Sequence, residues 1–195
     1  MFKYDELRNY LNEFLSTRKE NIIPLAEFRK FLRSKGLHDK GRFSSSILRL
    51  SAYGDLYLYR DVTERIFIIK DPSKFNEKEF LLSTKSTASR IYTFILTLID
   101  LQSKNPNMYI NTRTIMAEYR KKYPHLYYKG NPIFRLIKTA LHELGYLEYT
   151  GTLSSKTANV RLTDEFMKKY GNLTLEKFKQ LLREMQPIVS KSKRR

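Results

Sequence analysis

Apolar side chains in the first seventy residues recur three and four positions apart, the spacing that places them on one side of an α-helix. The spacing is clearest at Leu7, Leu11 and Phe14. Pro24 suits the first turn of a second helix, and Gly36 suits its end. The pattern predicts helices over 4–17, 24–36 and 42–53, followed by a β-hairpin of 56–60 and 65–70.

The second half of the chain repeats this order of elements. It opens with a helix that is apolar on most sides, and Asn111 or Thr112 can cap a later helix that Pro124 ends. Gly145 ends the helix after that. The pattern predicts helices over 88–101, 112–123, 131–144 and 174–185, one more beginning at 163, and strands over 108–110, 146–150 and 159–162.

A polar stretch that contains Pro72 separates the two halves and has room for one helical turn. Beyond the last predicted helix the chain is short, polar and basic, and we expect it to be disordered. We therefore divide the chain into an N-terminal domain (1–70), a linker (71–86), a C-terminal domain (87–170), a C-terminal helix (171–186) and a basic tail (187–195).

The halves also share a few letters at equivalent places. Lys40-Gly41 precedes the third helix of the first half, and Lys129-Gly130 precedes the matching helix of the second. The segments 54–57 and 145–148 follow these helices, so the offsets are 89 and 91 residues. Offsets of this size, close to half of the chain, indicate a duplicated domain and not a short-period repeat.

The net charge is the most informative property of the composition. The chain carries 37 Lys and Arg against 20 Asp and Glu, a formal net charge of +17, and most of the excess lies after residue 80. Such an excess points to a polyanionic partner, with nucleic acid first and an anionic membrane surface second. A Lys-rich protein without such a partner is the third interpretation.

Composition also excludes several kinds of chemistry. The absence of cysteine rules out disulfides, thiolate metal sites and cysteine nucleophiles. The longest apolar stretch, 91–101, is far shorter than the ~20 residues that a membrane span needs. The first ten residues carry charges where a signal peptide has an apolar run. We expect a cytoplasmic, nucleoid-associated protein that does not contact a membrane.

The order helix, helix or strand–helix, helix, two-stranded hairpin resembles the winged helix-turn-helix. The most specific match is the segment 136–149, with Leu-Gly-Tyr-Leu near its end, followed by Val-Arg-Leu-Thr in 160–163. This ending is similar to that of prokaryotic winged-helix regulators. In layout the chain also resembles archaeal and plasmid replication initiators. The resemblance implies a mainly α fold with small β-hairpin wings (α+β), arranged as two such domains in tandem.

The resemblance makes the third helix of each domain the candidate DNA-reading element. In the second half, a helical wheel puts Ile137 and Leu141 on one side and a set of polar residues opposite. In the first half, Phe43 and Ile47 face inward in the same way. The outward residues that we expect to contact base edges or phosphates are Arg135, Lys138, Thr139 and His142 in the second half and Arg42, Ser45 and Arg49 in the first.

Further cations flank these helices. The second hairpin loop is small and polar and carries Lys156, a candidate phosphate or minor-groove contact. The first loop carries Asp61 and Glu64, which phosphates would repel, so we expect it to lie off the DNA. Residues expected to position the protein along phosphates are Arg113, Lys121, Lys122 and Lys129, with Arg194 and Arg195 in the tail.

Two interpretations of function stay open. The favoured one is sequence-specific binding of double-stranded DNA, as a transcription regulator or a replication initiator. The alternative is an adaptor that uses winged helices to hold a transcription or replication protein, and a homodimer through 174–185 is a further option. The chain lacks nucleotide-binding and metalloprotease motifs and clustered acids, so we expect no enzyme, no catalytic residue, no metal and no cofactor.

Overall fold

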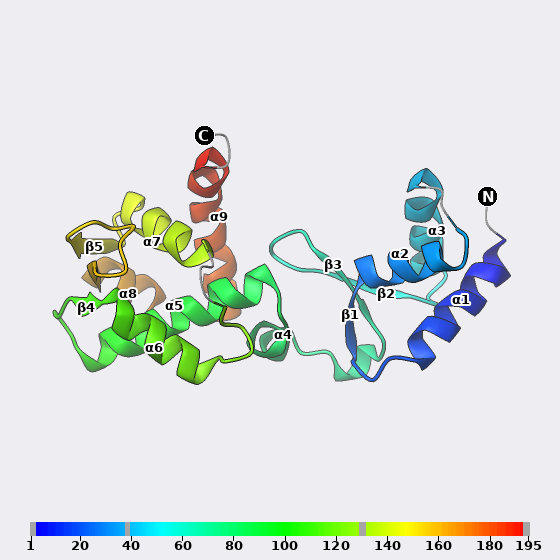
Figure 1. The fold of residues 1–195 in the computed structure, drawn as a ribbon, viewed down its shortest axis with the longest axis horizontal. Coiled ribbons are helices and arrows are strands. Elements are labelled where there is room, and N and C mark those ends of the chain that lie inside the picture. Colours follow the sequence, from blue (N-terminus) through cyan, green and yellow to red (C-terminus); the bar gives the residue numbers. More distant parts are fainter. Residues whose placement is uncertain (1–2, 38–39, 129–131, 193–195) are drawn as a thin grey trace. The chain divides into compact units, whose positions relative to one another are not determined.

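The computed structural model describes residues 3–37, 40–128 and 132–192. The chain divides into two compact units, Met1–Glu77 and Lys78–Arg195, and their boundary falls inside the segment predicted as a linker. Each described unit combines helices with a three-stranded antiparallel sheet, which confirms the α+β part of the predicted fold class (Figure 1).

Unit 1 follows the predicted order, with one strand added. Its elements are α1 (Tyr4–Ser16), β1 (Ile22–Pro24), α2 (Leu25–Ser34), α3 (Lys40–Ala52), β2 (Tyr57–Arg60), β3 (Ile66–Ile69) and the 3₁₀ turn η1 (Pro72–Lys74). The strand order is β1-β3-β2, with Ile23 opposite Ile68 and Leu58 opposite Ile68 on the other side. The third strand was not predicted because only three residues form it.

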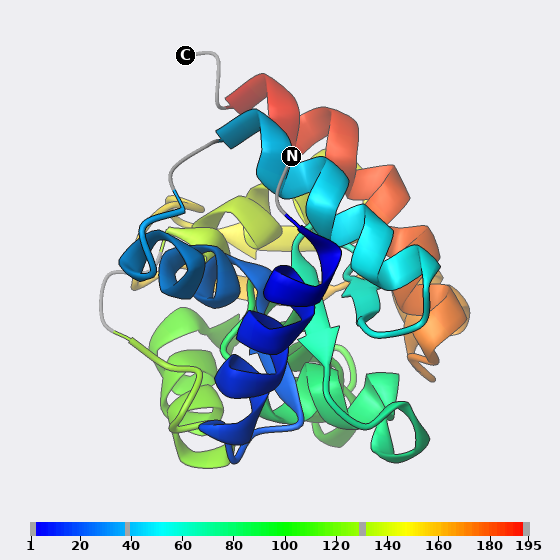
Figure 2. The same ribbon diagram turned by 90° about the vertical axis from the view of Figure 1, so that its right-hand side faces the viewer.

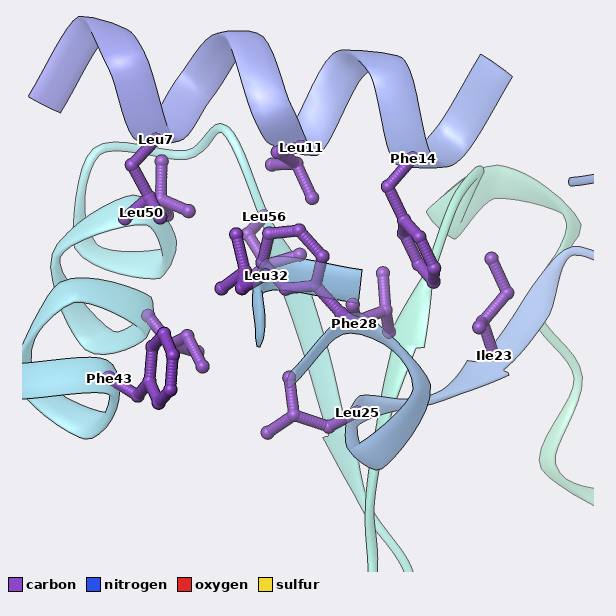
Figure 3. Close-up of a cluster of buried hydrophobic side chains, with 12 residues drawn as sticks. Leu7, Leu11, Phe14, Ile23, Leu25, Phe28, Leu32, Phe43, Leu50 and Leu56 are labelled. Carbon is purple, nitrogen blue, oxygen red and sulfur yellow. The ribbon is translucent and has the colours of Figure 1, made fainter. Parts of the chain in front are cut away.

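The core of unit 1 lies between α1 and the elements beneath it. Leu7, Leu11 and Phe14 project from one side of α1 toward Leu32 of α2 and Leu50 of α3 (Figure 3). The same helix packs against both α2 and α3, which is visible in the turned view (Figure 2). The apolar residues that recur three and four positions apart in α1 are therefore the ones that are buried.

Unit 2 repeats the order with a longer C-terminal part. Its elements are α4 (Glu77–Ser83, which begins at the boundary residue), α5 (Thr87–Lys104), β4 (Ile110–Asn111), α6 (Thr112–Lys122), α7 (Ile133–Glu143), β5 (Leu147–Thr150), β6 (Asn159–Leu162), α8 (Asp164–Tyr170) and α9 (Leu175–Ser192). Its strand order, β4-β6-β5, matches that of unit 1 position for position.

α5 is the central helix of unit 2, and α6 and α7 pack against it (Figure 1). The buried threonines and the buried glutamine of this helix have hydrogen-bond partners, both within the helix and in other elements. Thr93 and Thr97 donate to carbonyls four residues earlier, and the amide of Gln102 bonds to the carbonyls of Asn105 and Met108 and to the backbone N–H of Leu162. These bonds let a helix with polar residues occupy the core without unpaired donors.

Local capping explains where several helices begin and end. The side chains of Ser86, Asn111 and Thr163 accept backbone N–H bonds at the starts of α5, α6 and α8, so the predicted cap at Asn111 is confirmed. Gly54 and Gly145 follow α3 and α7 with positive φ angles of 79° and 75°, a conformation that favours glycine.

Two predictions about the less regular segments are corrected. The predicted linker contains η1 and all of α4, more structure than the single turn expected. The predicted disordered tail is helical as far as Ser192, because α9 continues through Pro187. The apolar spacing predicts this helix only over 174–185.

Candidate nucleic-acid interface

The outward side of α7 is the first candidate surface. Phe134, Ile137 and Leu141 are buried, and α7 packs on α5 and α9. Opposite them, the side chain of Arg135 is exposed and Thr139 is half-buried. Within the described part of the chain, Arg135 has no hydrogen bond or ion pair, so its guanidinium can bind a ligand without breaking one.

Lys138 does not lie on this outward side, and that prediction was wrong. It is only 3% exposed, and its ammonium donates to the carbonyl oxygen of Leu153 at 2.9 Å and to the Thr112 hydroxyl at 3.3 Å. A weaker bond reaches the carbonyl of Ser155 at 3.5 Å. Burial lowers the pKa of Lys138 from its usual value. The residue therefore joins α7, the start of α6 and the hairpin loop.

His142 is at the edge of the same surface, where α7 meets the hairpin. Its Nδ1 lies 2.9 Å from the carbonyl oxygen of Leu147, and its ring meets the ring of Tyr149 edge-on at 4.8 Å between centres. A bond between Nδ1–H and this carbonyl leaves Nε2 as the acceptor of a neutral ring. His142 can thus present an acceptor outward, beside an exposed tyrosine on β5.

The hairpin loop between β5 and β6 adds one more exposed cation. Lys156 is exposed, as predicted. Around it the loop is ordered by bonds from the backbone N–H of Ser155 to the Thr152 carbonyl at 2.8 Å, and of Thr157 to the Ser155 hydroxyl at 3.0 Å. The loop therefore holds Lys156 on a defined turn that Lys138 supports from beneath.

The cations of α6 divide into exposed and paired ones. Arg113 and Lys121 are exposed, as a phosphate contact requires. Lys122 is the last residue of α6, and it forms an ion pair with Asp100 and a longer one, 3.7 Å, with Glu118. Bonding to Asp100 raises the pKa of Lys122, and the Lys122 and Lys104 ammonium groups lower that of Asp100. Lys122 is thus used within the fold.

In unit 1, the outward side of α3 carries Ser45 and Arg49, both exposed. The Arg49 guanidinium lies 5.2 Å from the centre of the Tyr4 ring and 5.8 Å from that of Tyr53. Leu48, beside it, is 64% exposed. The described part of this surface therefore combines one cation with an exposed apolar side chain.

The first hairpin forms as predicted, and Asp61 and Glu64 lie in the turn between β2 and β3. Asp61 is buried, and its Oδ1 accepts from the backbone N–H groups of Thr63 and Arg65 at 2.8 and 3.0 Å, so it organises the turn and does not face solvent. Glu64 is exposed but forms an ion pair with Arg60 at 2.8 Å. Glu64 is thus paired, whereas Asp61 has no cationic partner among the described residues and its Oδ2 is buried without a hydrogen bond. The expectation that this turn lies off DNA stays a prediction.

Four predicted contacts lie outside the described residues or side chains: Arg42 (side chain only), Lys129, Arg194 and Arg195. Sequence reasoning missed two arginines with clear roles. Arg161 forms an ion pair with Glu148 at 3.0 Å, and Arg90 bonds to the carbonyl of Leu126. The opposite charges at 148 and 161 on paired strands could have signalled the first, but nothing local in the sequence signals the second.

Comparisons with known protein families, with curated proteins and with solved structures found no match to this chain. Among the described residues, no helix is both long and apolar enough to cross a membrane. The same residues contain no group of three or more His, Cys, Asp or Glu side chains placed to hold a metal ion.

Proposed function

We propose that this chain is a DNA-binding protein, not an enzyme, and that it binds specific duplex sites through two winged-helix domains in tandem, as a transcription regulator or a replication initiator. The order helix, strand, helix, helix, hairpin occurs in both units, and the two sheets have the same strand order. This is the arrangement of a helix-turn-helix with a wing, which supports the proposal.

The observation that carries the proposal is the outward side of α7. Arg135, Thr139 and His142 lie three and four residues apart on it, next to a hairpin loop that carries Lys156. A guanidinium pairs bidentately with guanine, and a hydroxyl and an imidazole can bond to base edges. Unit 2 also holds most of the positive charge, with 22 basic and 9 acidic residues against 15 and 11 in unit 1.

The test begins with selection of binding sites from a random duplex pool, followed by affinity measurements at one fixed salt concentration. We expect Arg135→Ala to reduce the discrimination between the selected site and random duplex by about 1–3 kcal/mol. Lys121→Ala, the matched control at the exposed end of α6, should weaken both duplexes equally. Failure to enrich any site would contradict sequence-specific binding.

An adaptor role is the second candidate, and one observation favours it. Leu48 and Tyr53 are both more than half exposed on and just after α3, next to Arg49. Exposed tyrosine and arginine together are typical of the centre of protein interfaces, and the exposed leucine beside them adds apolar surface. If Leu48→Asp leaves binding to a selected DNA site intact but abolishes capture of a transcription or replication protein, unit 1 serves the adaptor role.

A further inference from the structure

The turn between α6 and α7 is longer than the helix-turn-helix arrangement needs. Lys122 ends α6 and Ile133 begins α7, so ten residues connect them, where such turns usually have about three or four. The described part of this turn contains Tyr123, Tyr127 and Tyr128. Extra length that carries aromatic residues is a common property of functional loops.

The described part of the turn, residues 123–128, is anchored to other elements of unit 2. Leu126 is buried in its middle, and the guanidinium Nε of Arg90 donates to the carbonyl oxygen of Leu126 at 3.3 Å. His125 Nε2 lies 2.9 Å from the carbonyl oxygen of Leu82. These contacts fix the backbone on both sides of the apolar anchor, so the tyrosines that follow have a defined base.

Two of these tyrosines each lie beside a guanidinium. Arg90, from α5, lies 5.3 Å from the centre of the Tyr128 ring, and Arg120, from α6, lies 5.7 Å from that of Tyr127. Tyr128 is 51% exposed and Tyr127 is half-buried. An aromatic ring that a guanidinium flanks while much of its surface is open can accept a nucleobase by stacking.

The other two tyrosines of this region are used in the core. Tyr119 is buried and packs edge-on against Phe134 at 4.9 Å, and Tyr123 lies 5.6 Å from Tyr119. Core packing therefore accounts for Tyr119 and Tyr123 but not for the exposed ring of Tyr128. Within this short segment, Tyr128 thus has a ring on the surface, whereas Tyr119 and Tyr123 have a structural role.

Charge around the turn suits a nucleic-acid backbone. The described residues 113–128 contain four basic side chains and a single acid, Glu118, which pairs with Lys122. Arg120 and Lys121 are exposed at the end of α6, directly before the turn. A strand whose base stacks on Tyr128 would carry its phosphates past these cations.

We propose that the described part of this turn, residues 123–128, binds unpaired nucleobases of single-stranded or locally melted DNA, with Tyr128 as the stacking platform and with Arg90 and Arg120 beside the rings. This site is separate from the outward side of α7 and requires no recognition of a duplex sequence. This inference goes beyond the proposed function, and an experiment can contradict one of the two without contradicting the other.

The test uses the full chain and a labelled twelve-nucleotide dT strand, with affinity measured by fluorescence anisotropy at one low salt concentration. Tyr128→Leu removes the π-face but keeps an apolar side chain, and we expect it to weaken dT binding roughly 5- to 150-fold. Tyr128→Phe keeps the ring and should bind within about twofold of the original chain. Tyr57→Leu is the matched control, because Tyr57 is 52% exposed on β2.

Three further DNA ligands separate stacking from charge and from duplex binding. An abasic strand of equal length should bind the original chain more weakly than dT, and Tyr128→Leu should abolish that difference. A fully paired duplex should bind the original chain and Tyr128→Leu equally, and a duplex with a central bubble should distinguish them. Equal losses on dT and abasic strands, or no loss, would overturn the proposal. Binding to duplex without binding to dT would overturn it while leaving the proposed function standing.

Discussion

The buried ammonium of Lys138 offers the sharpest test of how the second hairpin loop is held. The change Lys138→Met keeps nearly the same length and volume but removes the charge and its donors. It breaks well-formed bonds to Leu153 and Thr112, at 2.9 and 3.3 Å. The loop itself, including Lys156, stays chemically unchanged.

Two opposing effects decide the magnitude. A hydrogen bond from a charged group contributes about 1.5–3 kcal/mol, so the two bonds together contribute several kcal/mol. Burying an ammonium costs several kcal/mol as well, and no carboxylate among the described residues forms an ion pair with Lys138. Because these nearly cancel, we expect the global free energy of unfolding to change by less than about 2 kcal/mol.

The effect on the hairpin loop is not offset in this way, because the substitution removes the bond that attaches the loop and adds no new contact to it. We expect the backbone N–H groups of Ser155 and Thr157 to exchange with deuterium about tenfold faster or more, which corresponds to about 1.4 kcal/mol of local opening free energy. Lys156→Met is the matched control and should leave this exchange unchanged, since the Lys156 side chain is exposed. Unchanged exchange in Lys138→Met would refute the idea that Lys138 holds the loop.

Three other outcomes follow from the charges of the fold. Affinity for duplex DNA should fall steeply between about 50 and 200 mM salt, and a flat salt dependence would contradict electrostatic binding. Lys122→Ala should lower the free energy of unfolding by about 0.2–1 kcal/mol, because it breaks the pair with Asp100, yet change DNA affinity less than Lys121→Ala does. Burial, with the hydrogen bond to Glu184, raises the pKa of Tyr170 to about 12. Since the unfolded chain loses this proton nearer pH 10, stability should fall between about pH 10 and 12 in denaturation experiments, and less so in Tyr170→Phe.

Periodicity predicted the elements of this fold well, because most helices bury one side. The apolar residues of α1 and α7 that the spacing selected are the ones that form the cores. The strand β1 was not predicted, because the segment Ile22–Pro24 is too short to show an alternation of apolar and polar residues. It exists because β3 supplies a partner more than forty residues later in the chain.

The candidate site was less predictable, because a helical wheel describes one helix and takes no account of contacts with other elements. Lys138 falls near the boundary of the polar side, and only the hairpin loop, fifteen and more residues later, covers it. The partner of Lys122 is Asp100, on another helix. By contrast, Arg135 and Lys156 were placed correctly on the surface, since nothing from elsewhere in unit 2 packs over them.

The common strand order of the two sheets has a consequence for how the chain refolds. Neighbouring units of one topology can exchange strands and form misassembled species. Here the central strands differ in character: β3 is wholly apolar, whereas β6 carries Asn159 and Arg161. If β3 took the place of β6, Glu148 would lose its ion pair with Arg161, and Asn111 would lose its bond to Asn159. Dissimilar central strands thus favour correct assembly, and refolding from denaturant should return monomers in high yield even at raised protein concentration.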